Sequence, residues 1–112
     1  MPRVTVAGSG AGAGWVSELV AKTGRKVSAV DNAPKMVEFG AKLAKKHGFK
    51  NLEYRLGDIA DPPIAKGSVD LAIFSQALHH AIHPERAIAA AHHILKKGGR
   101  VVVLDLLSHR FE

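Results

Sequence analysis

The stretch VAGSGAGAGWVSELVA, residues 6–21, constrains the fold most, because four glycines stand between an apolar run and a helical pattern. Glycine permits tight turns and lets backbone N–H groups approach a ligand without an intervening Cβ. A strand, a glycine-rich turn and a helix in this order form the first unit of a nucleotide-binding α/β domain. Gly8, Gly10 and Gly12 are therefore predicted to bind a ligand. The glycines alone fit either a dinucleotide such as NAD or the nucleoside of S-adenosylmethionine.

Further strands and helices alternate along the rest of the chain. Short apolar runs predict strands over residues 3–7, 26–30, 52–56, 69–74 and 100–107. Apolar spacing, with proline at helix starts and glycine after helix ends, predicts helices over residues 12–23, 34–47 and 84–97. Residues 57–68, which contain two prolines and two glycines, are expected to form a loop, and residues 75–82 a connecting segment.

This alternation predicts the fold class. A chain of 112 residues is long enough for one domain, residues 1–112. Strands that alternate with helices form a parallel sheet with right-handed crossovers and helices on both faces. We therefore predict an α/β, Rossmann-like, doubly wound parallel sheet with the strand order 3-2-1-4-5. In such a sheet, ligands bind beyond the carboxyl ends of the strands, near the point where the winding reverses.

Two of the predicted helices carry an apolar face that would pack on this sheet. The faces comprise Trp15, Val16, Leu19 and Val20 in the first helix and Ile88, Ala91 and Leu95 in the third.

Polar residues follow the second and third predicted strands, where a nucleotide would bind. A carboxylate at Asp31 can accept hydrogen bonds from both hydroxyls of a ribose, although an aspartate there can also cap the following helix. Asn32 belongs to the same part of the candidate site. Asp58 can accept from an adenine amino group while the backbone of Ile59 contacts the ring and Met36 packs on its face. The alternative for Asp58 is an ordinary turn aspartate.

Three blocks of the second half make the chain resemble a known family. They are the acidic loop GDIADPP before the strand GSVDL, the ALHH segment after that strand, and LKKGGR before the last strand. Together they resemble the class I S-adenosylmethionine-dependent methyltransferases, particularly the small-molecule branch that includes the ubiquinone and menaquinone methylases. The resemblance covers nearly all of the chain and favours S-adenosylmethionine over NAD. That family usually has two further strands after the fifth, which this chain lacks.

The resemblance implies roles for single residues. The three glycines would lie along the methionine portion of the cofactor, Asp31 would hold the ribose, and Asp58 with Ile59 would read the adenine. Ser75 and Gln76 would lie beside the methionine and the mouth of the substrate site. The expected reaction is transfer of a methyl group from the sulfonium to a small-molecule acceptor, helped chiefly by positioning and exclusion of water.

The histidines are the candidate catalytic residues. His79 and His80 fall near the expected substrate mouth, and an imidazole that titrates near neutrality can act as a general base. No metal site is expected, since the histidine spacing offers no convincing third ligand.

Composition excludes several classes of protein. The chain has no cysteine, hence no disulfide and no thiolate zinc site, which suits a reducing cytoplasm. No apolar run reaches about 18 residues, so no membrane span is expected, and we predict a cytoplasmic protein. The net charge is +6, but the lysines are scattered with few aromatic residues among them, which argues against nucleic-acid binding.

Two alternatives to an enzyme stay open at this point: a non-catalytic module that binds S-adenosylmethionine or serves as a scaffold, and an NAD(P)-binding domain. The last predicted strand also bears on assembly, because Val101 to Leu107 would form an apolar edge with unpaired backbone groups. We expect a homodimer or higher assembly joined through this edge.

Overall fold

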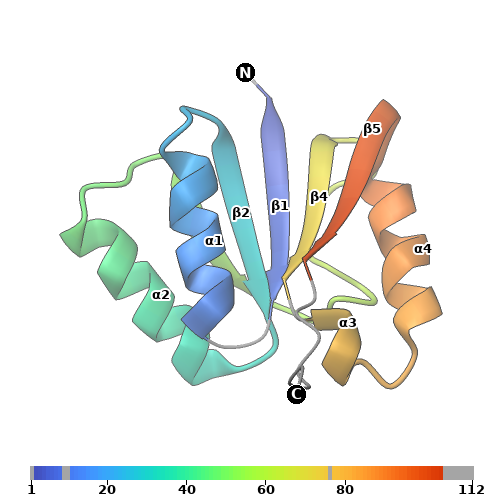
Figure 1. The fold of residues 1–112 in the computed structure, drawn as a ribbon, viewed down its shortest axis with the longest axis horizontal. Helices are drawn as coiled ribbons and strands as arrows, with labels where there is room; N and C mark the ends of the chain where they lie inside the picture. The colour runs from blue at the N-terminus through green and yellow to red at the C-terminus, as the bar shows by residue number, and fades with distance from the viewer. Residues whose placement is uncertain (1, 9–10, 76, 105–112) are drawn as a thin grey trace, which may run out of the picture.

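A parallel sheet of five strands forms the centre of the molecule. The computed structural model describes residues 2–8, 11–75 and 77–104. Within these residues the strand order is β3-β2-β1-β4-β5 (Figure 1), which confirms the predicted topology. The strands are β1 (Arg3–Gly8), β2 (Lys26–Asp31), β3 (Leu52–Leu56), β4 (Val69–Ser75) and β5 (Leu95–Leu104).

Helices cover both faces of this sheet. They are α1 (Ala11–Ala21), α2 (Pro34–Lys46), α3 (Ala77–His80) and α4 (Pro84–Ile94). Helices α1 and α2 lie on one side of the strands and α4 on the other (Figure 1). One core cluster, which includes Val4, Val6 and Val27, packs under α1 and α2. A second cluster, which includes Phe74 and Ala87, packs under α4, so the sheet is doubly wound as predicted. None of the described helices combines the length and the hydropathy that a membrane crossing requires.

The sequence signals for helix ends act as expected at α2. Pro34 occupies the first turn, where its missing N–H removes no hydrogen bond. The helix ends at Lys46, and Gly48 follows with a φ of 80°, a left-handed conformation that glycine adopts at little cost.

The buried faces of α1 and α4 differ from those predicted. In α1, Val16 is buried but Trp15 is 69% exposed and Leu19 is exposed as well. In α4, Ile88 is exposed, and the helix packs on the sheet through the row Ala87, Ala91 and Ile94 instead. Small side chains in such a row let a helix approach the strands closely, and this packing outweighs the larger apolar side chains at other positions.

The start of the last strand also differs from the prediction. Strand β5 begins at Leu95 rather than Arg100, because Leu95 is already extended and pairs with Val69. The next regular pair is Leu71 with Arg100, so the register shifts between them and residues 96–99 form an irregular excursion. The predicted glycine stop lies inside this excursion. Residues 105–107 of the predicted strand lie outside the described residues. The connecting segment 75–82 contains the short helix α3.

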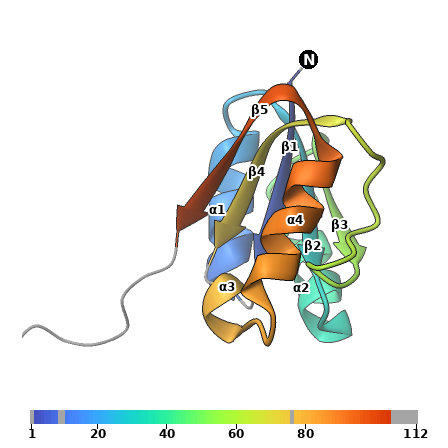
Figure 2. The ribbon, with the colours of Figure 1, turned by 90° about the vertical axis from the view of Figure 1, so that its right-hand side faces the viewer.

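The connection from β3 to β4 is a loop without a helix. Residues 57–68 contain one isolated bridge, between Asp58 and Asp61, and run from the end of β3 to the start of β4 on the side of the sheet that carries α4 (Figure 2). This loop therefore covers part of the sheet face that a helix would otherwise cover.

Candidate functional site

The winding of the sheet reverses between β1 and β4. Gly8 ends β1 and pairs with Ser75, the last residue of β4. Both residues are buried, and both lie at the carboxyl edge of the sheet. This is the position at which open α/β sheets bind their ligands.

Asp31 is fixed at the same edge by its backbone and its side chain. It is the last residue of β2 and only 7% exposed. Its Oδ1 accepts a hydrogen bond of 2.9 Å from the N–H of Ala33, and its carbonyl accepts one of 3.0 Å from the N–H of Gly57. These contacts orient the carboxylate between the end of β2 and the start of α2.

Asp58 is held by a turn of its own. The Oδ1 of this exposed residue accepts a hydrogen bond of 2.9 Å from the N–H of Ala60, and its carbonyl accepts one of 3.0 Å from the N–H of Asp61. The preceding Gly57 permits the loop to close, since a Cβ there would lie 2.6 Å from Cδ of Pro63. The residues of the GDIADPP block thus specify the turn that carries this carboxylate.

A cavity of about 320 Å³ opens beside these strand ends. Four residues of the predicted site line it, namely Gly8, Asn32, Asp58 and Ile59. The opposite wall comes from α3, α4 and the turn between them, through Ala77, Ala81, Ile82, His83, Arg86 and Ala87. Its volume lies at the lower end of the range of small-molecule sites. The sequence analysis did not assign Arg86 to the site, since only the packing of α4 on the sheet brings it there.

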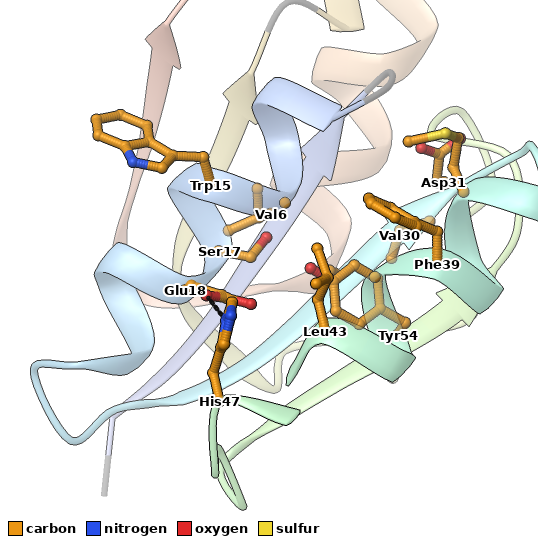
Figure 3. A pocket seen from close by; sticks show the side chains of 14 residues that line it. Val6, Trp15, Ser17, Glu18, Val30, Asp31, Phe39, Leu43, His47 and Tyr54 are labelled. Atoms are coloured by element: carbon orange, nitrogen blue, oxygen red, sulfur yellow. Dashed lines mark hydrogen bonds and ion pairs between the residues drawn. The ribbon is translucent and has the colours of Figure 1, made fainter. Parts of the chain in front are cut away.

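A second cavity, of about 200 Å³, lies between α1 and α2 (Figure 3). Asp31 and Met36 line this cavity and not the one beside Asp58. Its remaining wall is mostly apolar and includes Trp15 and Phe39. The structure therefore brings Gly8, Asn32, Asp58 and Ile59 together, with Asp31 and Met36 in the adjoining cavity.

A polar end closes the second cavity below Asp31. There, Nδ1 of His47 lies 2.8 Å from Oε1 of Glu18 (Figure 3). Tyr54 reaches from β3 across to α1, where it forms a side-chain hydrogen bond with Ser17. Burial raises the pKa of the Tyr54 phenol, the charge of Glu18 adds to this shift, and the hydrogen bond with Ser17 opposes it. The phenol therefore stays protonated at neutral pH.

Several predicted residues are described only in part or not at all. Gly10 and Gln76 lie outside the described residues. Gly12 is the second residue of α1. His79 and His80 belong to α3, but their side chains are outside the described part of the structure. Among the described residues, no three histidine, cysteine, aspartate or glutamate side chains form a group that could hold a metal ion.

The sequence matches the methyltransferase domain family over residues 8–103. It is 33% identical over 101 residues to the ubiquinone biosynthesis O-methyltransferase of Xanthomonas oryzae pv. oryzae, covering 87% of this chain and 41% of that protein. It is 31% identical over 109 residues to the arsenite methyltransferase of Halobacterium salinarum, covering 95% of this chain and 28% of that protein. The chain thus spans less than half the length of these curated relatives.

The fold is similar to that of solved methyltransferases as well. A SAM-dependent methyltransferase from Aquifex aeolicus superposes with a TM-score of 0.83 at 22% identity, covering 96% of this chain and 59% of that chain. With the family match over most of its length, the chain belongs to the class I methyltransferase domains. The cofactor of this family is S-adenosylmethionine.

Proposed function

We propose that this chain is the cofactor-binding domain of an enzyme that transfers a methyl group from S-adenosylmethionine to a small-molecule acceptor. The observation that carries the proposal is the pair of carboxylates, Asp31 and Asp58, which lie with Gly8 at the carboxyl ends of three neighbouring strands, β2, β3 and β1. Carboxylates so placed suit the hydroxyls of a ribose and the amino group of an adenine, and the glycine at the end of the next strand leaves room for the ligand.

Each site residue has a proposed role. Asp31 would accept hydrogen bonds from the ribose hydroxyls, and Asp58 with the backbone of Ile59 would bind the adenine, with Asn32 on the same wall. Gly8, Gly10 and Gly12 would contact the methionine portion, and Ser75 would lie beside it. Met36 would contact the nucleoside from the adjoining cavity that it shares with Asp31.

The chemical step requires little from the protein besides geometry. When bound, the cofactor supplies an electrophilic methyl group. The chain would hold the nucleoside at the edge of the sheet and exclude water from the reacting atoms. His79 or His80 stays the predicted general base for an acceptor that must lose a proton. The names of the relatives, which refer to arsenite and to ubiquinone biosynthesis, support a small molecule as the acceptor class.

Calorimetric titration with S-adenosylhomocysteine tests the binding site. The Asp31→Ala variant should bind it about 1.5 to 3 kcal/mol more weakly, the scale of a hydrogen bond to a charged group. Asp61→Ala is the matched control, because Asp61 is an exposed carboxylate of the neighbouring loop that lines neither of the two cavities. Equal affinities of the Asp31→Ala variant and the wild type would remove Asp31 from the site.

Two further measurements separate the alternatives. NAD should not compete with S-adenosylhomocysteine, and tighter binding of NAD would overturn the choice of cofactor. Transfer of a labelled methyl group to a panel of small acceptors by the full-length enzyme tests turnover. Cofactor binding without transfer to any acceptor would favour the non-catalytic module.

We also propose that β5 mediates self-association, in keeping with the exposed edge predicted for Val101 to Leu107. In its described part, residues 101–104 are 37–47% exposed, and β5 is an outer strand of the described sheet. The Val102→Lys substitution, which places a charge in β5, should weaken association. Ile88→Lys, at an exposed position of α4, should not. A wild-type chain that scatters light as a monomer at high micromolar concentration would contradict the proposal.

A cytoplasmic location is proposed on composition alone. The chain contains no cysteine, which suits a reducing compartment. Cell fractionation would test this prediction.

A further inference from the structure

Polar side chains lie on one face of the sheet in the amino-terminal halves of β1 and β2 and in the neighbouring part of β3. In β1, Val4 and Val6 belong to the core cluster under α1 and α2, so Thr5 faces the opposite side. Strand register extends this face, because Thr5 pairs with Ser28 and Ser28 pairs with Glu53. The polar face comprises Arg3, Thr5, Lys26, Ser28, Glu53 and Arg55.

A cavity of about 100 Å³ lies on this polar face. The sheet contributes Arg3, Thr5, Lys26, Ser28 and Arg55 to its lining. The loop 57–68 contributes residues 64, 65 and 68, at the place where a connecting helix would fill the space. A water molecule requires about 10–15 Å³ of such volume, so the cavity has room for a small polyatomic ligand. It lies at the amino end of the strands, whereas the cofactor site lies at the carboxyl end.

One buried hydroxyl in this lining has no protein partner. Thr5 is 3% exposed, and its Oγ1 makes no hydrogen bond to any described residue. The neighbouring hydroxyls are already engaged, since Ser28 donates to Glu53 at 3.1 Å and Ser68 donates to the carbonyl of Ala65 at 2.6 Å. Buried hydroxyls are nearly always hydrogen-bonded, so the orphaned Oγ1 of Thr5 indicates a missing partner in the cavity.

The charges around the cavity select an anion. Arg3, Lys26 and Arg55 line it, and no carboxylate among the described residues does. The nearest acid, Glu53, is already paired, because Arg55 donates to its two oxygens at 3.0 and 3.2 Å. These hydrogen bonds are the main cause of the lowered pKa of Glu53, and the charge of Lys26 lowers it further. Glu53 therefore stays ionised and orients the guanidinium of Arg55.

A second carboxylate near the rim is also engaged. Asp70 accepts a hydrogen bond of 2.8 Å from the backbone N–H of Arg3 and lies 3.5 Å from Nζ of Lys96. Among the described residues, the side chains of Arg3 and Lys26 form no hydrogen bond and no ion pair within 4 Å. Two cationic side chains are thus available to a ligand in the cavity.

We propose that this cavity binds a phosphate group, either free or carried on a small metabolite. Arg3 and Lys26 supply the charge, and the hydroxyl of Thr5 supplies a buried hydrogen bond to a phosphate oxygen. Arg55 donates to Glu53 and to the carbonyl of Pro63, so only its remaining N–H groups are left for the ligand. The cavity admits one such group, and the part of the chain that the structure describes contributes no aromatic side chain to its lining on which a nucleic-acid base could stack. The proposal is independent of methyl transfer, because the two sites lie at opposite ends of the strands.

Binding of inorganic phosphate, measured by calorimetry at constant ionic strength, tests the proposal. Lys26→Gln should weaken phosphate binding about tenfold or more. Lys35→Gln is the matched control, because Lys35 is exposed on α2 and does not line the cavity. Equal losses in the two variants, or no phosphate binding by the wild type at millimolar concentration, would overturn the site.

Thr5→Val provides the second test. This isosteric change should weaken phosphate binding several-fold while leaving the melting temperature without phosphate unchanged or higher, because it removes an unpartnered hydroxyl. Unchanged phosphate affinity in a folded Thr5→Val variant would remove Thr5 from the site. Titration with glycerol 3-phosphate distinguishes the two sources, since tighter binding than inorganic phosphate indicates a phosphorylated metabolite and equal or weaker binding indicates the free ion. The affinity for S-adenosylhomocysteine should be the same in all these variants.

Discussion

The two faces of the sheet formed by β1, β2 and β3 are covered by different structures. The face under α1 and α2, the apolar face, presents valine, alanine and leucine side chains to two helices, and the cavity between these helices has a mostly apolar wall. The opposite face, at the amino ends of the same strands, presents hydroxyls and charges to a loop and contains a cavity. Central strands of parallel sheets are usually apolar on both faces. Where a loop and not a helix connects β3 to β4, the sheet residues that the loop covers are polar.

The largest expected effect on stability comes from placing a charge on the apolar face. Val27 is fully buried, so Val27→Asp would put an unpaired carboxylate into the core and should cost about 3 kcal/mol or more. Lys26→Asp, one residue earlier and exposed on the opposite face, should leave the fold intact. Urea unfolding of both variants measures the contrast, and similar losses would mean that the two faces are not distinct.

A smaller loss of stability is expected from adding a side-chain atom to the packing against the apolar face. Gly40 on α2 lies against the ring of Tyr54, and a Cβ there would overlap that ring. Gly40→Ala should therefore destabilise the protein by about 1–3 kcal/mol. The Gly40→Ala, Tyr54→Leu double variant should recover part of the loss, because the shorter side chain vacates the space. Additive losses in the double-mutant cycle would contradict this contact.

Two opposite substitutions, valine to threonine on one face and threonine to valine on the other, compare the two faces directly. Val4 is 1% exposed on the apolar face, so Val4→Thr buries a hydroxyl without a partner and should lower the free energy of unfolding by about 1–3 kcal/mol. Thr5→Val, the reverse change on the polar face, should cost nothing in the absence of phosphate. Thermal unfolding of both variants in a chloride buffer checks the pair, and a loss in Thr5→Val equal to that in Val4→Thr would break the comparison.

The smallest expected effect is on the pH dependence of stability. Arg55 lowers the pKa of Glu53 in the folded protein, so the ionised carboxylate stabilises the fold above the pKa of the unfolded chain, and this contribution is lost as the pH falls through the folded-state pKa. Because both side chains are partly exposed, the contribution should be below about 1 kcal/mol. Glu53→Gln should be less stable than the wild type at pH 7, and the difference should shrink below about pH 4.5. A difference that is constant between pH 7 and pH 3 would exclude this ion pair as its source.

The sequence predicts the sheet well because its signals are local. Strand β3 has the predicted bounds, and the stops at Gly24 and Gly48 need only their own backbone conformations, with φ of 85° and 80°. The carboxylates at the ends of β2 and β3 are likewise found by spacing. The fold class and the position of the candidate site were therefore available before any packing was known.

Packing decides the features that the sequence analysis missed. In the run Ala87 to Ala91, several faces of the helix are apolar, so periodicity alone does not choose between the row with Ile88 and the row with Ile94. The excursion at residues 96–99 depends on pairing with β4, which no local pattern specifies. The polar face, however, had a signal, because RVTV, KVS and LEYR alternate polar and apolar residues.

Tyr54 has a consequence for the order in which the molecule assembles. Its ring lies under Gly40 of α2, and its hydroxyl bonds to Ser17 of α1, 37 residues earlier in the chain. Helices α1 and α2 can form locally, but the contacts that join them through Tyr54 form only after the outer strand β3 has been synthesised and has paired with β2. Contacts that close such long loops form slowly. The contacts that Tyr54 makes with the two helices are therefore expected to form late in folding, together with the completion of this edge of the sheet.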